Sequence, residues 1–196
     1  MPESPATVAA TRHDRLGALR PQLSLPLICA PMFLVSGPDL VIATCRSGVI
    51  GSFPAPNARP LEVLDGWMAR VASELEAARR SDPQARIAPW SINLVVHSSY
   101  DRLPAELELV QRHRPPIVIT ALGSPARVVD AIHAYGGRVF ADVGSVAMAR
   151  KAAQAGVDGL VLVSSGAGGH TGAVSPFVFV EAERQVFDGI EVLAGG

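Results

Sequence analysis

The stretch GVDGLVLVSSGAGGHTG, residues 156–172, joins an uninterrupted apolar run to a glycine-rich segment with a single histidine. The apolar run, residues 159–163, lacks the alternation of a strand with one wet face, which indicates a strand buried on both faces. Strands of that kind belong to parallel sheets that helices cover. The stretch therefore predicts an α/β fold in which a loop of unusual composition follows the carboxyl end of a strand.

Similar apolar runs recur along the chain and alternate with helical stretches. Helices are predicted at residues 61–80, 125–135 and 145–155, where Pro125 suits a first helical position and Ser145 suits an N-cap. This alternation predicts a parallel sheet with crossover helices. The seven predicted strands cover residues 27–30, 48–52, 91–96, 117–122, 138–143, 159–164 and 190–194.

Two architectures fit this order, a doubly wound open sheet and a (β/α)8 barrel. A barrel typically needs about 250 residues, whereas this chain has 196 and stops just after its seventh predicted strand. We therefore expect a TIM-barrel-like fold with about seven of its eight strands present. Residues 21–196 would form this truncated barrel, and residues 1–20 would form an exposed N-terminal lead-in.

Composition narrows the classes of function. The net charge is −1 and no basic stripe is visible, so we expect no nucleic-acid partner. No apolar run approaches the roughly 20 residues of a membrane helix, and the N-terminus lacks the apolar core of a signal peptide. These features predict a cytoplasmic protein without a membrane partner. Cys29 and Cys45 have apolar neighbours and are expected as free thiols, and no metal-ligand spacing is found.

The glycine-rich segment has three interpretations. A dinucleotide fingerprint is disfavoured, because Gly166, Gly168 and Gly172 give the spacing G-x-G-x-x-x-G and follow the sixth predicted strand instead of the first. A plain turn remains open. In the third interpretation the glycines let the backbone approach a ligand at the carboxyl rim of a barrel, where His170 handles protons. A histidine that only hydrogen-bonds its own loop is the alternative for His170.

One family shares this loop. Residues 168–172, Gly-Gly-His-Thr-Gly, resemble the GGHxG loop of the nitronate monooxygenase family of FMN-dependent barrels, also called 2-nitropropane dioxygenases, which includes enoyl-ACP reductases and NADH:quinone reductases. The first strand resembles the family's "APM", the third its "vNL" and the seventh its "AGG". Weaker similarities at residues 48–51, 123–125 and 139–155 follow in the same order, so the resemblance covers residues 20–196.

The sequence also departs from that family. Val163 stands where the family usually has Gln or Glu, and Gly166 stands where it usually has an acid. A side-chain contact from the sixth strand to the flavin is therefore absent, and other groups must substitute. The eighth strand, with a second glycine-rich phosphate segment, lies outside the sequence.

The resemblance assigns roles to particular residues. It implies that His170 takes the α-proton of a nitroalkane or orients its nitronate. Asn93 is a polar residue in an apolar strand, which fits either a flavin contact or a structural hydrogen bond. His97, just after the third predicted strand, is a weaker candidate for substrate contact. The residues implied to bind the cofactor are Ala30, Pro31, Met32, Asn93, Gly168, Gly195 and Gly196.

Three further side chains were weighed from their positions alone. Asp142 either faces the barrel mouth or pairs with a polar neighbour, and Thr120 is a candidate for the rim because it lies near the end of the fourth strand. Glu106 is expected on the solvated face of an amphipathic helix, together with Glu108.

The function implied by the resemblance is oxidation of alkyl nitronates or nitroalkanes by O2 with FMN as cofactor. A first alternative is an NAD(P)H-dependent flavin reductase that acts on a quinone or an enoyl-ACP or enoyl-CoA. A second alternative is an inactive barrel fragment, since a seven-stranded barrel exposes the edges of its first and last strands. Whether the chain pairs with a second copy as a homodimer stays open.

Overall fold

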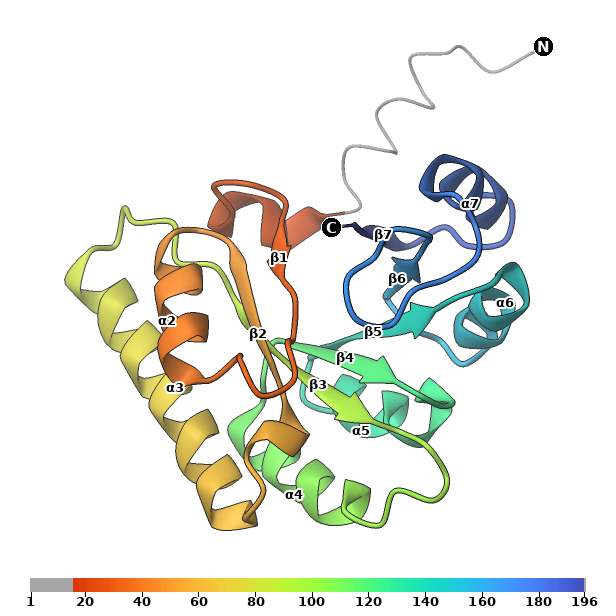
Figure 1. Ribbon diagram of the computed structural model, residues 1–196. Helices are drawn as coiled ribbons and strands as arrows, with labels where there is room; N and C mark the ends of the chain where they lie inside the picture. The colour runs from red at the N-terminus through yellow and green to blue at the C-terminus, as the bar shows by residue number, and fades with distance from the viewer. Residues whose placement is uncertain (1–15, 196) are drawn as a thin grey trace.

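The computed structural model describes residues 16–195, and Figure 1 shows strands arranged around a common interior with helices outside them. Seven parallel strands form one sheet in which neighbours in sequence are neighbours in space. Each predicted strand is present, with bounds that differ by two residues at most. The strands are β1 (Ile28–Cys29), β2 (Ile50–Pro54), β3 (Trp90–Val95), β4 (Ile117–Ala121), β5 (Arg138–Val143), β6 (Gly159–Val163) and β7 (Ile190–Ala194).

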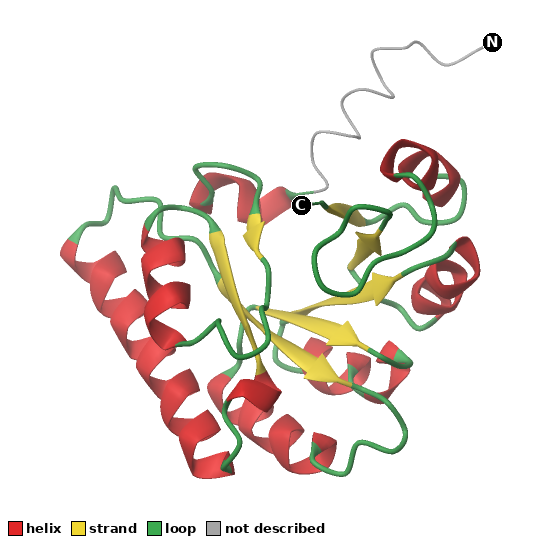
Figure 2. Ribbon diagram, in the orientation of Figure 1, coloured by secondary structure: helices red, strands yellow, loops and turns green. Residues whose placement is uncertain are grey.

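Helices cover the outer face of this sheet, as Figure 2 shows. The predicted N-cap is confirmed, because the Ser145 side chain accepts a hydrogen bond from the backbone N–H of Met148. The helix predicted at residues 125–135 is split at Val128, whose ψ of −18° and φ of −130° interrupt it. The helices are α2 (Pro38–Arg46), α3 (Leu61–Ser81), α4 (Leu103–His113), α5 (Val129–His133), α6 (Val146–Gln154) and α7 (Pro176–Glu183), with 3-10 helices η1 (Gly17–Gln22), η2 (Ala55–Asn57) and η3 (Pro125–Arg127).

The strand order decides between the two predicted architectures. A doubly wound sheet reverses its strand order at a switch point, which creates the ligand crevice of that fold. Here the order runs from β1 to β7 without a reversal, as in a (β/α) barrel. The doubly wound alternative is therefore wrong, and the carboxyl ends of all seven strands lie at one rim.

Alternating side chains of each strand divide the apolar core into two parts. On β5, Val139, Ala141 and Val143 pack in the outer core between the sheet and the helices. Phe140, on the opposite side of the same strand, packs in the inner core with Ile119 and residues of other strands. Burying one such side chain contributes roughly 1.5–3 kcal/mol, so both faces of the sheet stabilise the fold.

The segment that precedes β1 covers the amino-terminal end of the inner core. Leu19 of η1 and Leu23 are buried and pack against Ile50 and Ile190. Most of the lead-in predicted at residues 1–20 lies outside the described residues. Within its last part, Leu19 is buried instead of exposed, because it covers the amino-terminal end of the barrel interior.

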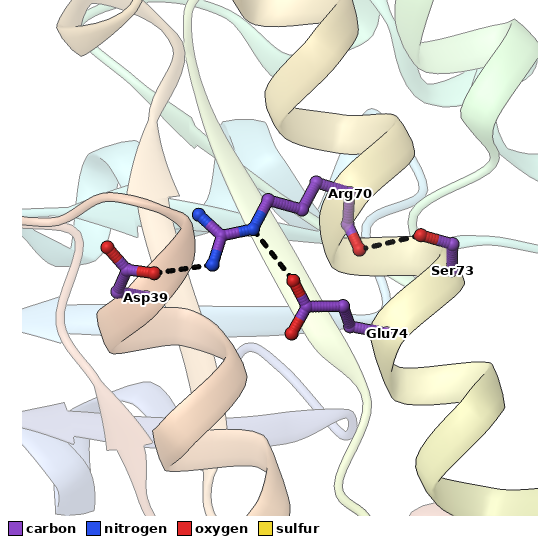
Figure 3. A network of polar contacts seen from close by, with 4 residues as sticks. All are labelled: Asp39, Arg70, Ser73 and Glu74. Carbon is purple, nitrogen blue, oxygen red and sulfur yellow. Dashed lines mark hydrogen bonds and ion pairs between the residues drawn. The ribbon is translucent and has the colours of Figure 1, made fainter.

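An ion-pair network links the first two helices (Figure 3). The guanidinium of Arg70 on α3 lies 2.6 Å from a carboxylate oxygen of Asp39 on α2 and 2.7 Å from one of Glu74, a turn further along α3. The Ser73 hydroxyl donates to the backbone carbonyl of Arg70. These groups are largely exposed, so the network orients α2 and α3 and adds little stability.

The two edge strands, β1 and β7, border a gap in the barrel wall. A cavity of about 660 Å³ lies there, and its lining includes Ile28 of β1, Ile190 and Val192 of β7, and Phe140 of the inner core. Arg184 and Glu191 add a charged pair at 3.2 Å. The two edges therefore face one space with a mostly apolar lining and one ion pair.

Candidate functional site

The carboxyl rim of the barrel carries the loops that contain the predicted site residues. The loop after β1 holds Ala30, Pro31 and Met32, and polar side chains fix its backbone. The Met32 N–H donates to Ser36 Oγ at 3.0 Å, and the Met32 carbonyl accepts a hydrogen bond from Asn57 Nδ2 at 3.0 Å. Both backbone groups of Met32 are thus engaged, so its side chain, 40% exposed, is what it offers a ligand.

Asn57, at the end of η2, makes further hydrogen bonds to this loop. The contacts of Ser36 and Asn57 with the loop are called the brace below. Its Nδ2 group also donates to the Ser36 carbonyl at 2.8 Å, and its Oδ1 accepts from the Leu34 N–H at 2.9 Å. Ser36 is buried beneath the loop. Neither Ser36 nor Asn57 was predicted from sequence, although Asn57 is a polar residue that closely follows β2, a position that could have marked it.

Large apolar side chains are exposed around this rim. Two of them, Leu34 and Leu122, have a φ of +61°, a conformation uncommon outside glycine that is often found near functional sites. Phe177, at the start of α7, is 85% exposed. Such an apolar surface is typical of a site that binds an apolar group. The exposed apolar residues in the rim loops and at the start of α7 are Met32, Phe33, Leu34, Val35, Leu122, Phe177 and Val178.

Asn93 lies on β3 with its side chain in the barrel interior and is 7% exposed. It pairs in register with Pro54 of β2 and Ile119 of β4. Its Nδ2 group donates to the Ile119 carbonyl at 3.3 Å. This contact is the structural hydrogen bond weighed from sequence, and it orients the amide inward without using the Oδ1 atom.

The segment after β3 is fixed through its backbone. The Arg127 guanidinium donates to the carbonyls of Val96 and His97, at 3.2 and 2.7 Å. The His97 ring is exposed, and its Nδ1 accepts the Ser99 N–H at 3.2 Å and lies 2.7 Å from Ser99 Oγ. His97 therefore stays at the rim, held by its own turn. A Cβ added at Gly123 would lie 2.5 Å from the Val96 carbonyl oxygen, so the loop after β4 packs tightly against this segment.

The glycine-rich loop after β6 is anchored at its base. Ser164 is buried, its Oγ donates to the Ala194 carbonyl at 3.0 Å, and its own carbonyl accepts the Gly172 N–H and the Thr171 hydroxyl at 3.1 Å. A Cβ on Gly172 would lie 2.0 Å from the Val163 carbonyl oxygen, so only glycine fits there. These contacts fix where the loop begins and ends.

The tip of the same loop is open. Ideal Cβ atoms built on Gly166, Gly168 and Gly169 meet nothing within 4 Å, and His170 is exposed. Gly195, beyond the end of β7, is equally open. The Ser164–Ala194 hydrogen bond places the loop and the end of β7 side by side, whereas Gly196 lies outside the described residues.

Two further candidates from the sequence, Thr120 and Asp142, lie on neighbouring strands and face opposite sides of the sheet. Thr120 pairs in register with Ala141 of the outer core, so it faces the helices, and its hydroxyl donates to the Phe140 carbonyl at 3.3 Å. It is not a rim residue. Asp142 is partly buried, and burial raises the pKa of its carboxyl to about 7.

Glu106 corrects a prediction, because its side chain is 0% exposed instead of solvated. Its carboxylate accepts the Tyr100 hydroxyl at 2.8 Å and lies 3.2 Å from the Arg102 guanidinium. Burial raises the pKa of Glu106, which these two partners counteract. Arg102 also donates to the Ala58 carbonyl at 3.0 Å, so the three residues brace the segment after β3 against the one after β2.

Between residues 16 and 195, His, Cys, Asp and Glu side chains form no group of three or more that could hold a metal ion. In the same part of the chain, no helix has both the length and the apolar character needed to cross a membrane. Cys45 is buried and Cys29 partly buried, both as free thiols.

The geometry is that of a (β/α) barrel whose candidate site residues lie at its carboxyl rim. The sequence profile of the nitronate monooxygenase family matches residues 91–196, more than half of the chain. This chain belongs to that family, as its motifs predicted. A nitronate monooxygenase of Paraburkholderia phytofirmans is 29% identical over 83% of this chain and 52% of its own length.

A relative with a different name matches as well. A 5-hydroxy-7a-methyl-1-oxo-octahydro-1H-indene-4-carboxyl-CoA dehydrogenase of Rhodococcus jostii is 25% identical over 87% of this chain and 44% of its own length. The chain thus spans about half the length of these relatives.

Solved structures confirm the TIM-barrel-like fold. FabK of Thermotoga maritima, 20% identical, superposes with a TM-score of 0.76 and covers 91% of this chain and 53% of its own. Nitroalkane oxidase of Streptomyces ansochromogenes, 18% identical, gives the same TM-score over 91% of this chain and 60% of its own.

The groups at the rim are compatible with the flavin cofactor that the family implies. Asn93 directs its amide into the barrel, and the Asp142 carboxyl has no hydrogen-bond partner among residues 16–195. Gly168 and Gly195 leave open space where side chains would otherwise stand. Backbone N–H groups without side chains are a common cradle for phosphate.

Proposed function

We propose that this chain forms the cofactor-binding part of an FMN-dependent oxidoreductase that oxidises alkyl nitronates or nitroalkanes with O2. The observation that carries the proposal is the Ser164–Ala194 hydrogen bond. It joins the loop of His170 to the end of β7, so two of the motifs that resemble the family lie side by side. The family membership supports the same activity.

The chain offers separate surfaces for each part of the cofactor. Ala30, Pro31 and the Met32 side chain would lie against the ring on the braced loop after β1, and Asn93 would meet its polar edge. Gly168 would approach the ring through its backbone, and Gly195 with Gly196 would donate N–H groups to the phosphate. When bound, FMN supplies a two-electron acceptor that O2 can reoxidise.

His170 handles the proton in this proposal. Its side chain is exposed at the open tip of the loop, where a small substrate has access. Histidine is the side chain most often used for proton transfer near neutral pH. With a neutral nitroalkane, His170 removes the α-proton, whereas with a preformed nitronate it only orients the anion. The loop base anchored by Ser164 holds the imidazole near the ring.

The test begins with the visible spectrum of the purified chain after incubation with FMN and removal of free cofactor. We expect flavin absorption bands that stay with the protein, and O2 consumption when propionate 3-nitronate is added. A spectrum without flavin bands would support the inactive-fragment alternative instead. Flavin that remains bound but is not reduced by nitronate under anaerobic conditions would overturn the proposed substrate and leave the cofactor standing.

A second candidate is reduction of an enoyl thioester or a quinone, with NAD(P)H as the electron donor. The CoA-ester name of the Rhodococcus relative favours it, together with the exposed apolar rim that would suit an acyl group. Anaerobic mixing with NADPH separates the two candidates. Rapid flavin bleaching by NADPH, with none by nitronate, would favour the thioester or quinone reaction.

A further inference from the structure

Asp142 points into the barrel near its carboxyl rim. On β5, Val139, Ala141 and Val143 face the outer core, whereas Phe140 faces the inner core. Because side chains alternate along a strand, Asp142 lies on the same side as Phe140 and one step nearer the rim. The carboxyl is therefore directed toward the space that the rim loops surround.

The neighbours of Asp142 are apolar or small. It pairs in register with Val161 of β6, which pairs with Val192 of β7. On the other side Thr120 pairs with Ala141, so the next inward position of β4 is Ala121. These facing residues carry no charge, and burial is the cause of its pKa of about 7.

A carboxyl without partners in such surroundings needs an explanation. Burying a polar group without a hydrogen bond costs free energy, so the fold gains nothing from this side chain by itself. Asn93 is the other inward polar residue in the carboxyl-terminal halves of β3 to β7, and it lies on the far side of β4. Asn93 is in register with Phe140, two residues before Asp142, so two strand spacings of about 4.8 Å and two residue steps of about 3.3 Å put the Asn93 and Asp142 backbones about 12 Å apart. The two polar groups face one ligand-sized space.

Building on the proposed function, we propose that Asp142 binds the imide edge of the flavin ring through a pair of hydrogen bonds. That edge presents an N–H group beside carbonyl oxygens. A neutral carboxylic acid is complementary to it, since its O–H donates to a ring carbonyl while its C=O accepts the ring N–H. A carboxylate would accept from the N–H but repel the carbonyl oxygen.

The pairing makes flavin affinity depend on the protonation of Asp142. The acid form dominates below about pH 7, so binding at higher pH takes up one proton. A carboxamide has the same donor and acceptor pattern as the neutral acid and does not titrate. Asp142→Asn therefore preserves the pairing at all pH values, whereas Asp142→Ala removes it.

The experiment measures flavin fluorescence quenching by the full chain and these two variants at about pH 6 and about pH 8.5. For the unsubstituted chain we expect the Kd to rise about 30-fold between the two pH values, as one proton with a pKa near 7 requires. Asp142→Asn should change less than threefold. Asp142→Ala should bind at least tenfold more weakly at about pH 6, the effect of one to two lost hydrogen bonds.

Two controls separate the titration of Asp142 from that of other groups. Riboflavin replaces FMN in a parallel series, because the phosphate of FMN itself titrates near pH 6. His97 and His170 are present in all three proteins, so the difference between the unsubstituted chain and Asp142→Asn reports Asp142. Circular dichroism melts establish that both variants are folded.

The outcomes separate this inference from the proposed function. Equal affinities of all three proteins, or tighter binding at higher pH, would overturn the role of Asp142 while flavin binding stands. Absence of quenching by the unsubstituted chain at both pH values would overturn flavin binding itself, and the role of Asp142 with it.

Discussion

Two loops of the rim are built in opposite ways. In the loop after β1, Asn57 and Ser36 hydrogen-bond the backbone of Met32 and Leu34 across the middle of the loop. In the loop after β6, Ser164 fixes only the base, and the tip from Gly166 to His170 meets open space. One loop is braced along its length, and the other is held at its ends.

The difference matches what each loop would have to do. A braced loop presents a constant apolar surface, which suits a platform for a rigid ring. A loop anchored at its base can bring a side chain to one region while its tip adjusts to the ligand. The glycines at the tip serve this adjustment, whereas Gly172 serves the anchor, because a Cβ there would overlap the Val163 carbonyl.

The largest expected effect is on turnover and comes from His170, at the tip of the loop after β6. His170→Ala should lower turnover of a neutral nitroalkane by roughly 10²–10⁴-fold, the usual contribution of general acid–base catalysis. Turnover of the preformed nitronate should fall much less, because that substrate has already lost its proton. Steady-state O2 consumption with both forms measures the ratio. His133→Ala is the control, since His133 lies on α5 and its ring contacts Asp158, just before β6 and away from the carboxyl rim. Equal losses on both forms would contradict the role of His170 as a base.

The next effect is on stability and comes from Gly172, at the base of the same loop. Gly172→Ala places a Cβ 2.0 Å from a backbone oxygen, so the loop base must shift and break the hydrogen bonds to Ser164. We expect a loss of about 3 kcal/mol in the free energy of unfolding, as for other overpacked sites. Gly168→Ala is the control, because its Cβ would meet open space. Urea denaturation measures both, and similar values for the two variants would refute the division between anchor and tip.

The sequence predicted the strands because runs such as residues 159–163 are apolar throughout, a pattern that burial on both faces requires. It missed α7, where the neighbouring residues Phe177, Val178 and Phe179 are apolar on all sides and give no stripe of period 3.6. The solvated position predicted for Glu106 was wrong, because its partners Tyr100 and Arg102 are recognisable only after the chain folds.

The site was predictable to a similar extent. The glycine loop and the residues after β1 were predicted from their resemblance to the family and their order along the chain, and this part stays a prediction, although the structure places the loop beside the end of β7. The brace was not found, since Asn57 acts on Met32 across 25 positions of sequence. Its position just after β2 marks Asn57 as a residue near the rim, but nothing in the sequence identifies Met32 as its partner.

The glycine loop leads into α7, which carries a second testable group, Glu183. This side chain is 0% exposed, and burial, aided by the nearby Glu191, raises its pKa to about 7, which Arg150 partly opposes. The folded protein thus holds a proton that the unfolded chain releases above about pH 4.5. Protonation of Glu183 therefore stabilises the folded state over the unfolded chain. This contribution to the free energy of unfolding is complete below about pH 4.5 and is lost as the pH rises through about 7.

Glu183→Gln should remove this dependence. Between about pH 5 and pH 8 the unsubstituted chain should lose about 2–3 kcal/mol of unfolding free energy more than the variant. Thermal melts across this range measure the difference, at roughly 2–4 °C per kcal/mol. Glu181→Gln, on the exposed side of the same helix, should melt like the unsubstituted chain at each pH. Parallel curves for Glu183→Gln and the unsubstituted chain would show that Glu183 does not titrate in this range.

The smallest effect tests the brace itself. Asn57→Ala removes the three hydrogen bonds that cross the loop after β1, but water replaces part of them because the loop is exposed. We expect a loss of only about 1 kcal/mol in unfolding free energy. Flavin affinity should fall more than stability does, because the freed loop must pay conformational entropy when it orders against the ring. Asn57→Asp keeps the acceptor for the Leu34 N–H and should give an intermediate affinity. A stable protein with unchanged flavin affinity in both variants would mean that the brace does not prepare the loop for its ligand.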